Sequence, residues 1–324
     1  MEELLKVNHL EVSFFTDLGE SRAVKDASFV IGKGEVFGIV GESGSGKSVA
    51  TKNILRLGPK NMKVKSGEIL FKDKDILKLS MRELQNLRGS EISMVFQDSL
   101  SALNPVYPVG KKMVELLRLH NRNLSKTDAK KQVISLFESV GIVDPERCFK
   151  SYPHELSGGM RQRIMIAMAI CCNPDLMIAD EPTTALDVTI QAQILHLLRD
   201  IQRERGMSLI LITHDLGVVA QMCSRVAVMC GGYVVEQGNV RDIFHNPAHP
   251  YTQALIASMP RVGGGRMEQY LERSMTDNRD QEICPFYGRC RHAIDACADT
   301  LPTMKTIEGN HCSFCHLGKE ALHV

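Results

Sequence analysis

Short apolar runs rich in β-branched residues alternate along the chain with segments whose apolar residues recur at helical spacing. Residues 36–40 (VFGIV) predict a buried strand, and residues 49–57 continue at helical spacing. Within residues 105–150, VGKKMVELLRL and DAKKQVISLFESVGI are amphipathic and predict two further helices. The run RVAVMCGGYVVEQG, with its two glycines at Gly231 and Gly232, predicts a hairpin. The alternation indicates an α/β fold.

A glycine-rich segment joins the first predicted strand to its helix. Residues 41–48, GESGSGKS, match the pattern G-x-x-x-x-G-K-[ST] of a phosphate-binding loop. Glycines let backbone N–H groups close around phosphate oxygens, and the helix points its positive end at the same anion. We expect Lys47 to reach the β- and γ-phosphates and Ser48 to bind Mg²⁺, and the preceding strand disfavours a simple glycine turn. The residues predicted to bind nucleotide are Gly41, Glu42, Ser43, Gly44, Ser45, Gly46, Lys47, Ser48 and Val49.

A second apolar run, in residues 175–181 (DLMIADE), ends in two carboxylates. At the tip of a strand, Asp180 can bind Mg²⁺ through water, and Glu181 can polarise the attacking water as a general base. Strands commonly end in acidic turn residues, so this pair is a weak signal by itself. The pair becomes informative together with the neighbouring segments LSGGMRQR, ALD and SLILITHD.

The order of these segments, over about residues 4–245, resembles that of the ATP-binding cassette (ABC) ATPases. The resemblance identifies residues 156–160 as the family's signature, with Met160 where Gln is usual. At the start of a predicted helix, this segment makes a second anion-binding helix end. The family implies that the signature comes from a second subunit placed head to tail, so that two ATP molecules are sandwiched. The residues expected to meet phosphate are unchanged: Ser157, Gly158 and Gly159.

The same resemblance assigns roles to other residues. Gln97, in SMVFQDSLSALNP, is implied to be the glutamine that reports the γ-phosphate and, with Ser48 and Asp180, to bind Mg²⁺. Asp187 ends the D-loop, and His214 is the switch histidine that contacts the γ-phosphate. Catalysis is then expected to consist mainly of positioning and electrostatic stabilisation of phosphoryl transfer, with Gln97, Glu181 and His214 as the catalytic residues.

The fold implied by the resemblance is a P-loop NTPase (RecA-like) core with an antiparallel β subdomain. An inserted α-helical signature subdomain is expected at about residues 100–170, within an ATPase domain at residues 1–245. Residues 246–324 are expected to form a small, loop-rich, metal-binding extension. Family members stack an aromatic ring on adenine, and we favour Phe14 over Phe15. Because strand neighbours point to opposite faces, the other ring is expected to enter a core.

Five cysteines lie within thirty-two residues of the tail: Cys284, Cys290, Cys297, Cys312 and Cys315. Four thiolates suit either a tetrahedral zinc ion or an iron–sulfur cluster, and free thiols are the third possibility. The segment has too few apolar residues for a core of its own, so a crosslinking metal is expected to hold it together. Zinc sites usually contain C-x2-C steps, and only Cys312 and Cys315 have that spacing.

The segment NPAHPYTQALIASMP and the cysteine-bearing tail resemble one branch of the family, the ATPase subunits of dipeptide and oligopeptide importers. This resemblance implies a [4Fe–4S] cluster on Cys284, Cys290, Cys297 and Cys315, with Cys312 as the alternative fourth ligand and zinc as the alternative metal. The other five cysteines lie in or beside apolar stretches and are expected to be buried: Cys148, Cys171, Cys172, Cys223 and Cys230.

The branch also implies partners, namely a second, related ATPase, two membrane-spanning permeases and an extracytoplasmic substrate-binding protein. The start, MEELLKV, lacks the features of a secretory signal, and the longest apolar run, residues 164–172, is too short to cross a bilayer. We therefore expect a peripheral protein at the cytoplasmic face of the inner membrane. A net charge of +1 without basic blocks argues against nucleic acid as a partner. The alternatives are a nickel or metallophore importer subunit and a non-transport ABC ATPase.

Overall fold

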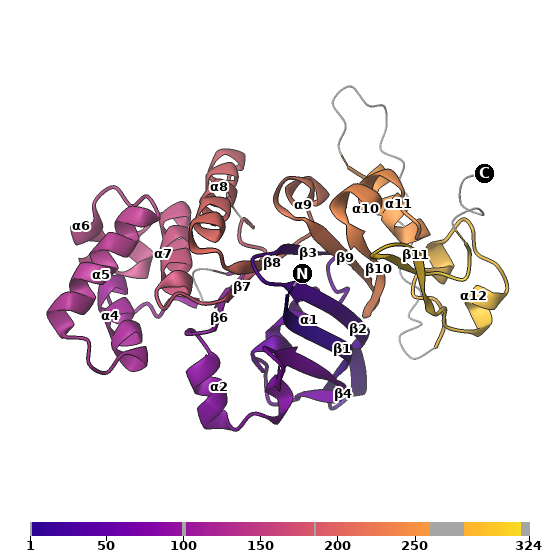
Figure 1. The fold of residues 1–324 in the computed structure, drawn as a ribbon, viewed down its shortest axis with the longest axis horizontal. Helices are drawn as coiled ribbons and strands as arrows, with labels where there is room; N and C mark the ends of the chain where they lie inside the picture. Colours follow the sequence, from indigo (N-terminus) through magenta and orange to yellow (C-terminus); the bar gives the residue numbers. More distant parts are fainter. Residues whose placement is uncertain (1, 99–101, 185, 260–281, 319–324) are drawn as a thin grey trace. The chain divides into compact units, whose positions relative to one another are not determined.

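The structure is a computed structural model, which describes residues 2–98, 102–184, 186–259 and 282–318. It divides into two compact units (Figure 1). The first consists of Met1–Lys78 and Leu211–Val324, and the second of Leu79–Ile210. Strand β8 (Ser208–Thr213) runs across the division. Each unit is described by itself.

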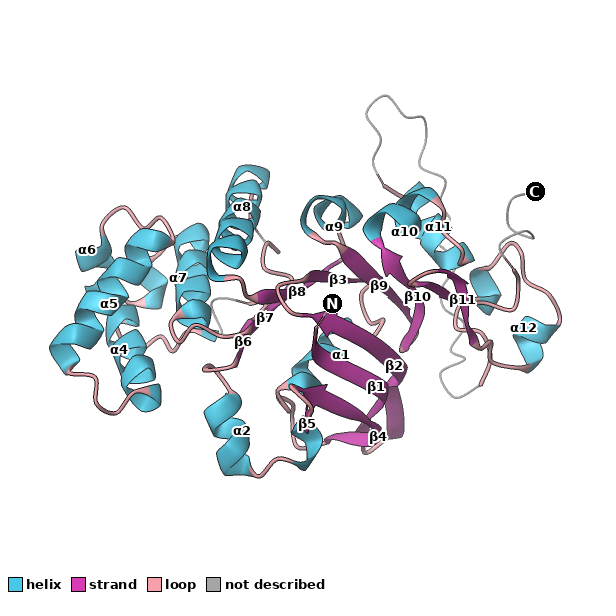
Figure 2. Cartoon of the chain, in the orientation of Figure 1, coloured by secondary structure: helices cyan, strands magenta, loops and turns pink. Residues whose placement is uncertain are grey.

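Two long antiparallel strands, β1 (Glu3–Thr16) and β2 (Gly19–Gly32), open the first unit (Figure 2). Strand β4 (Met62–Phe71) pairs with β1 in antiparallel register, and the short β5 (Lys74–Asp75) pairs with β4 and leads into the 3-10 turn η1 (Ile76–Lys78). The apolar residues Leu5, Val7, Leu10 and Val12 of β1 are buried, whereas the polar residues between them are half-buried or exposed, as expected for a sheet with one face on the core. The predicted antiparallel β subdomain is confirmed.

The phosphate-loop strand, β3 (Val36–Val40), lies in the same unit and pairs in parallel with β9 (Arg225–Cys230). Strand β9 turns into β10 (Tyr233–Asn239), with which it pairs antiparallel, so the predicted hairpin is confirmed. Ahead of the cysteine-bearing tail, the described helices of this unit are α1 (Lys47–Ile54), α9 (Leu216–Met222), α10 (Val240–His245) and α11 (Pro250–Ala257).

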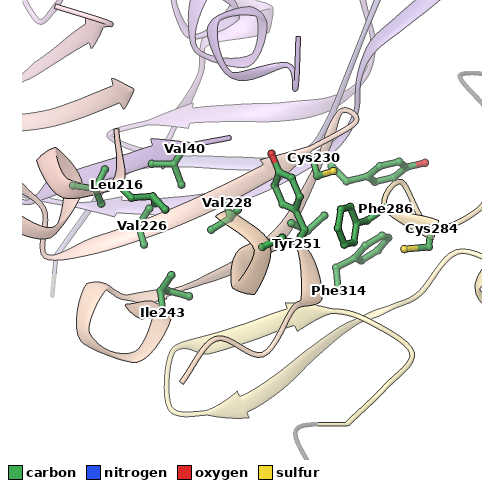
Figure 3. Close-up of a cluster of buried hydrophobic side chains, with 14 of the residues drawn as sticks. Val40, Leu216, Val226, Val228, Cys230, Ile243, Tyr251, Cys284, Phe286 and Phe314 are labelled. Atoms are coloured by element: carbon green, nitrogen blue, oxygen red, sulfur yellow. The ribbon is translucent and has the colours of Figure 1, made fainter. Parts of the chain in front are cut away.

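The cysteine-bearing tail contributes η3 (Tyr287–Arg289), α12 (Ala296–Asp299), β11 (Met304–Glu308) and β12 (His311–Phe314). Strand β12 pairs antiparallel with β10, with Ser313 opposite Glu236, and so extends the sheet of the first unit. The side chains of Phe286, Phe314 and Cys284 are buried in the same hydrophobic cluster as Tyr251 (Figure 3).

The apolar side chains of this tail are thus buried in a cluster shared with Tyr251 and not in a core of the tail's own, in keeping with its composition. The tail's few apolar residues fill a core that the rest of the unit also contributes to. The composition of a single segment does not reveal such sharing. The ring of Phe314 stacks on that of Tyr233, with the centroids 5.3 Å apart.

The second unit is mostly helical. Its two paired strands, β6 (Ile92–Val95) and β7 (Leu176–Asp180), run parallel, with Val95 opposite Ala179. Side-chain oxygens of Ser125, Asp144, Ser157 and Asp187 cap the helices that follow them. The two helices predicted within residues 105–150 are present as α4 and α5. The helical elements of this unit are α2 (Met81–Leu87), α4 (Val109–His120), α5 (Lys126–Ser139), α6 (Pro145–Lys150), η2 (Pro153–Glu155), α7 (Gly158–Ile170) and α8 (Val188–Arg205).

Candidate functional site

The glycine-rich loop connects β3 to α1 through backbone geometry that only glycine accommodates. A Cβ atom on Gly41 would lie 2.2 Å from the carbonyl oxygen of Met229, and one on Gly46 would lie 2.7 Å from that of Ala23. Gly46 is the N-cap of α1, with φ 101°, and it provides no side-chain cap. The glycines thus let the loop close tightly in front of α1, and the first N–H groups of a helix behind such a loop form an anion-binding helix end.

Lys47 folds back over this loop. Its side-chain Nζ donates hydrogen bonds of 2.8 Å to the carbonyl oxygens of Gly41 and of Glu42, and the residue is only 5% exposed. The ammonium group is therefore held where it adds positive charge to the end of α1, and Ser48 follows it in the first turn of that helix.

Two residues that sequence reasoning missed hold the same loop. The backbone N–H of Glu42 donates to the hydroxyl of Tyr251 at 2.9 Å, and the Glu42 carboxylate pairs with the guanidinium of Arg289 at 3.0 Å. These partners lie 209 and 247 residues away along the chain. No local pattern signals such distant contacts.

In the second unit, the structure brings Gln97 and Glu181 together. Gln97 Nε2 donates to Glu181 Oε2 at 2.9 Å, and the hydroxyl of Thr184 donates to the same oxygen at 2.8 Å. Gln97 follows the carboxyl end of β6, and Glu181 follows that of β7. These two strands are parallel, so their carboxyl ends meet at one edge of the sheet. Asp180, the last residue of β7, is fully buried, and Glu181 has φ 46°, in the left-handed region that a non-glycine residue rarely adopts.

The signature segment and the D-loop pack against each other within the second unit. Ser157 is the N-cap of α7, where its hydroxyl accepts a 3.3 Å hydrogen bond from the N–H of Met160. A Cβ on Gly159 would lie 3.0 Å from Ile190 Cγ2, so a glycine lets α7 approach the first turn of α8. Asp187 caps α8 through a 2.9 Å hydrogen bond from the N–H of Ile190.

His214 lies in the first unit, directly after β8. It is exposed and precedes Asp215, whose carboxylate caps α9 through the N–H groups of Gly217 and Val218. This cap holds the backbone of Asp215, the residue directly after His214, at the start of α9.

The two candidate adenine-stacking rings are both half-buried, so neither enters the core. The ammonium groups of Lys63 and Lys65 lie over the ring of Phe15, at 5.2 and 5.4 Å from its centroid. The expectation that the ring not used for adenine is a core residue was therefore wrong. The reason is that Phe14 and Phe15 lie near the end of β1, where the paired residues at the start of β2 are exposed.

Four of the five tail cysteines form a group. The thiols of Cys284, Cys290, Cys297 and Cys315 interact electrostatically with one another. Burial, with a smaller contribution from the neighbouring thiols, raises the pKa of Cys284 to about 12 and that of Cys290 to about 11. Cys312 instead contacts the hydroxyl of Thr306, with its sulfur 3.8 Å from Oγ1.

None of the ten cysteines, all of which lie in the described part of the chain, forms a disulfide. Among the described residues, no three His, Cys, Asp or Glu side chains are arranged closely enough to hold a single metal ion. Of the five cysteines expected to be buried, Cys148 and Cys230 are buried. The other three are half-buried: Cys171, Cys172 and Cys223.

No helix in the described ranges combines the length and apolar character needed to cross a membrane.

Comparisons with known proteins place these features in a family. A family model described as ABC transporter matches residues 24–184, and one described as Oligopeptide/dipeptide transporter, C-terminal region, matches residues 235–297. The chain is 48% identical to the dipeptide transport ATP-binding protein DppD of Bacillus subtilis (strain 168), over 98% of this chain and 95% of that protein. It is 45% identical to the oligopeptide transport ATP-binding protein OppD of Salmonella typhimurium (strain LT2), over 92% of this chain and 89% of that protein.

Among known structures, the chain is similar to the ATP-binding cassette MJ0796 in a dimeric post-hydrolysis state bound to ADP and phosphate. The TM-score is 0.66 at 28% identity, covering 74% of this chain and 99% of that chain. This likeness confirms the predicted P-loop NTPase fold with its α/β core. The chain belongs to the ABC transporter family, among the ATP-binding proteins that carry the oligopeptide/dipeptide transporter C-terminal region.

Proposed function

We propose that this chain is the ATP-hydrolysing, energy-coupling subunit of an importer of dipeptides or oligopeptides. The observation that carries the proposal is the glycine loop with Lys47 folded over it, in a chain whose C-terminal region matches that of peptide transporters. The relatives at 48% and 45% identity are named for dipeptide and oligopeptide transport, and their similarity extends over nearly the whole chain.

Nucleotide binding is assigned to the loop of residues 41–49. Its backbone N–H groups and the end of α1 bind the phosphates, and Lys47 exchanges its two carbonyl contacts for phosphate oxygens. A Mg²⁺ ion would be held by oxygen ligands from Ser48, Asp180 and Gln97, where it would neutralise charge between the β- and γ-phosphates. Hydroxyl, carboxylate and amide oxygens are the ligand types that this ion prefers. Phe14 is assigned to the adenine ring.

Hydrolysis is assigned to Glu181 as the general base. Gln97 and Thr184 both donate to its Oε2, and these two hydrogen bonds orient the carboxylate that would accept the proton of the attacking water. The left-handed backbone of Glu181 restricts where the carboxylate can point. His214 contacts the γ-phosphate and stabilises the charge that develops on it.

A second copy of the cassette completes each nucleotide site. The N-terminal end of α7 is an anion-binding helix end, with Ser157, Gly158 and Gly159 at its first positions. We assign this end to the ATP bound by the partner ATPase, with Asp187 beside it. The likeness to a dimeric cassette with ADP and phosphate supports the arrangement.

The tail cysteines are assigned to a [4Fe–4S] cluster held by Cys284, Cys290, Cys297 and Cys315. Three of these four thiols are buried and that of Cys290 is half-buried, and the four interact electrostatically, whereas Cys312 contacts Thr306. A single zinc ion would need its sulfurs about 2.3 Å from one point, and the described residues have no such group. In a four-iron cluster each thiolate would bind its own iron, so the four sulfurs need not meet at one point. The bound cluster would supply a structural crosslink or a redox sensor.

The remaining assignments concern organisation. The nucleotide-binding domain spans residues 1–245, with a helical signature subdomain at about residues 100–170, and the extension spans residues 246–324. The chain works with a second, related ATPase, two permeases and an extracytoplasmic binding protein, and it lies peripherally at the cytoplasmic face of the membrane. Nucleic acid is not a partner, since the net charge is only +1.

The function is tested by uptake in cells that lack this chain. Labelled dipeptides and oligopeptides and labelled nickel are supplied in parallel, and the cells are complemented with the wild-type chain or with Lys47→Ala. We expect peptide uptake to fall and to be restored by the wild type alone. Loss of nickel uptake with normal peptide uptake would assign the chain to the nickel importers. Unchanged uptake of both, with normal ATPase activity of the purified chain, would favour a non-transport ATPase.

A further inference from the structure

The second residue of the phosphate loop is held from the C-terminal part of the chain. Arg289 Nη1 and Nη2 each donate a 3.0 Å hydrogen bond to one carboxylate oxygen of Glu42. Tyr251, from α11, accepts the backbone N–H of the same residue at 2.9 Å. Such a two-pronged arginine–carboxylate contact fixes orientation as well as distance.

These contacts come from a rigid, buried setting. The Arg289 side chain is 5% exposed and its guanidinium lies over the rings of Phe286 and Tyr251, 5.2 and 5.9 Å from their centroids. The two rings meet edge to face at 5.4 Å. Arg289 ends the turn η3 and directly precedes Cys290. The position of its charge is therefore set by the folding of the cysteine-bearing tail.

The charge of this pair matters for an anionic ligand. Glu42 lies within the loop that would surround the phosphates, and its carboxylate is 27% exposed. An uncompensated carboxylate there would repel the phosphates, because charges a few ångströms apart at a partly buried site interact strongly. Arg289 cancels that charge without itself being one of the loop residues.

We infer that Arg289 is a positioning residue of the nucleotide site: it neutralises and orients Glu42, and so links ATP affinity to the folded state of the cysteine-bearing tail. Tyr251 assists by fixing the backbone of the same residue. The inference rests on the proposed binding of ATP to the loop of residues 41–49. It predicts that the effect of losing Arg289 depends on whether Glu42 keeps its charge.

The test measures ATP dissociation constants and steady-state kinetics for Arg289→Gln, Glu42→Gln and the double variant in the full chain. We expect Arg289→Gln to weaken ATP binding about tenfold and to raise KM more than it changes kcat. Glu42→Gln alone, a change within the loop itself, is the reference for the double variant, and it should weaken ATP binding less than Arg289→Gln does, because it leaves no unpaired negative charge beside the phosphates. The double variant should recover to within about threefold of the wild type, since neither charge is left unpaired. Arg289→Lys, which keeps the charge, should lie between wild type and Arg289→Gln.

A matched control is Arg225→Gln. Arg225 on β9 pairs with the buried Glu35 at 3.3 Å in the same unit, far along the strand from the loop. This control should lower thermal stability and leave ATP affinity unchanged. Circular dichroism establishes that each variant is folded.

Two outcomes would overturn the inference. Wild-type affinity in a folded Arg289→Gln protein would show that the charge pair does not affect the site. A double variant as weak as Arg289→Gln would show that Arg289 acts through the fold alone, independently of Glu42. Failure of the wild-type chain itself to bind ATP would instead refute the proposed function, so the two failures are distinguishable.

Discussion

Gln97 Nε2 donates a 2.9 Å hydrogen bond to Glu181 Oε2, so the amide from the loop after β6 orients the carboxylate that directly follows β7. Eighty-four residues separate the two in sequence. The parallel pairing of Val95 with Ala179 brings them to the same edge, and Thr184 donates to the same carboxylate oxygen. Removing one donor therefore leaves the other in place.

Glu181→Gln should lower ATP turnover about 100-fold or more, because an amide cannot accept the proton of the attacking water. ATP affinity should change little, since the phosphate loop is untouched. Gln97→Ala, with the Thr184 donor retained, should lower kcat about tenfold or less. Single-turnover hydrolysis and nucleotide titrations measure both effects. Normal turnover by Glu181→Gln would refute its role as general base.

Ser157→Asp tests the signature helix end. Aspartate is a good N-cap, so α7 should remain stable, but its negative charge would face the phosphates of the partner's ATP. In a Glu181→Gln background, we expect ATP-dependent dimers to be lost. Ser157→Asn, a neutral N-cap of similar shape, should keep most of them. Size-exclusion chromatography with and without ATP measures this, and dimers that persist equally in both variants would contradict the assignment.

The cysteine group predicts which thiols hold iron. After anaerobic purification, we expect about four iron and four sulfide per chain. Cys315→Ser should lose most of this content, whereas Cys312→Ser should retain it, because Cys312 contacts Thr306 outside the group of four. Iron and sulfide analysis with absorption spectra gives the readout. Stoichiometric zinc in the wild type, or equal loss in both variants, would contradict the cluster assignment.

His249 predicts a pH dependence of stability. Burial lowers the pKa of His249 from 6.5 to about 3, and its Nδ1 accepts the N–H of Tyr251 at 3.0 Å. Between these pKa values the unfolded chain binds a proton that the folded chain excludes, so stability is lost as the pH falls below about 6.5. Between pH 7.5 and 5.5 the contribution is about 1.4 kcal/mol.

His249→Asn, which keeps an N-cap acceptor for α11, should remove that contribution. Chemical denaturation of both proteins at the two pH values gives the comparison. The wild type should lose about 1.4 kcal/mol more than the variant on acidification. Parallel losses in the two proteins would show that His249 can take up its proton in the folded state.

Much of the nucleotide site was predictable because its chemistry is local. Eight consecutive residues specify the phosphate loop, and the apolar run before them specifies β3, since glycine geometry and a following helix act over a few residues. The hairpin of β9 and β10 and the helices α4 and α5 also followed from short-range periodicity.

The sequence by itself thus determined the class of fold, the phosphate loop and the order of motifs. Only the tertiary structure decided that β12 joins β10, that the tail shares a core with Tyr251, and that Arg289 pairs with Glu42. These contacts span up to 247 residues, and they depend on which sheet edge is open and which apolar surfaces meet. Periodicity and composition describe each segment separately, whereas pairing and packing are properties of segments brought together by the fold.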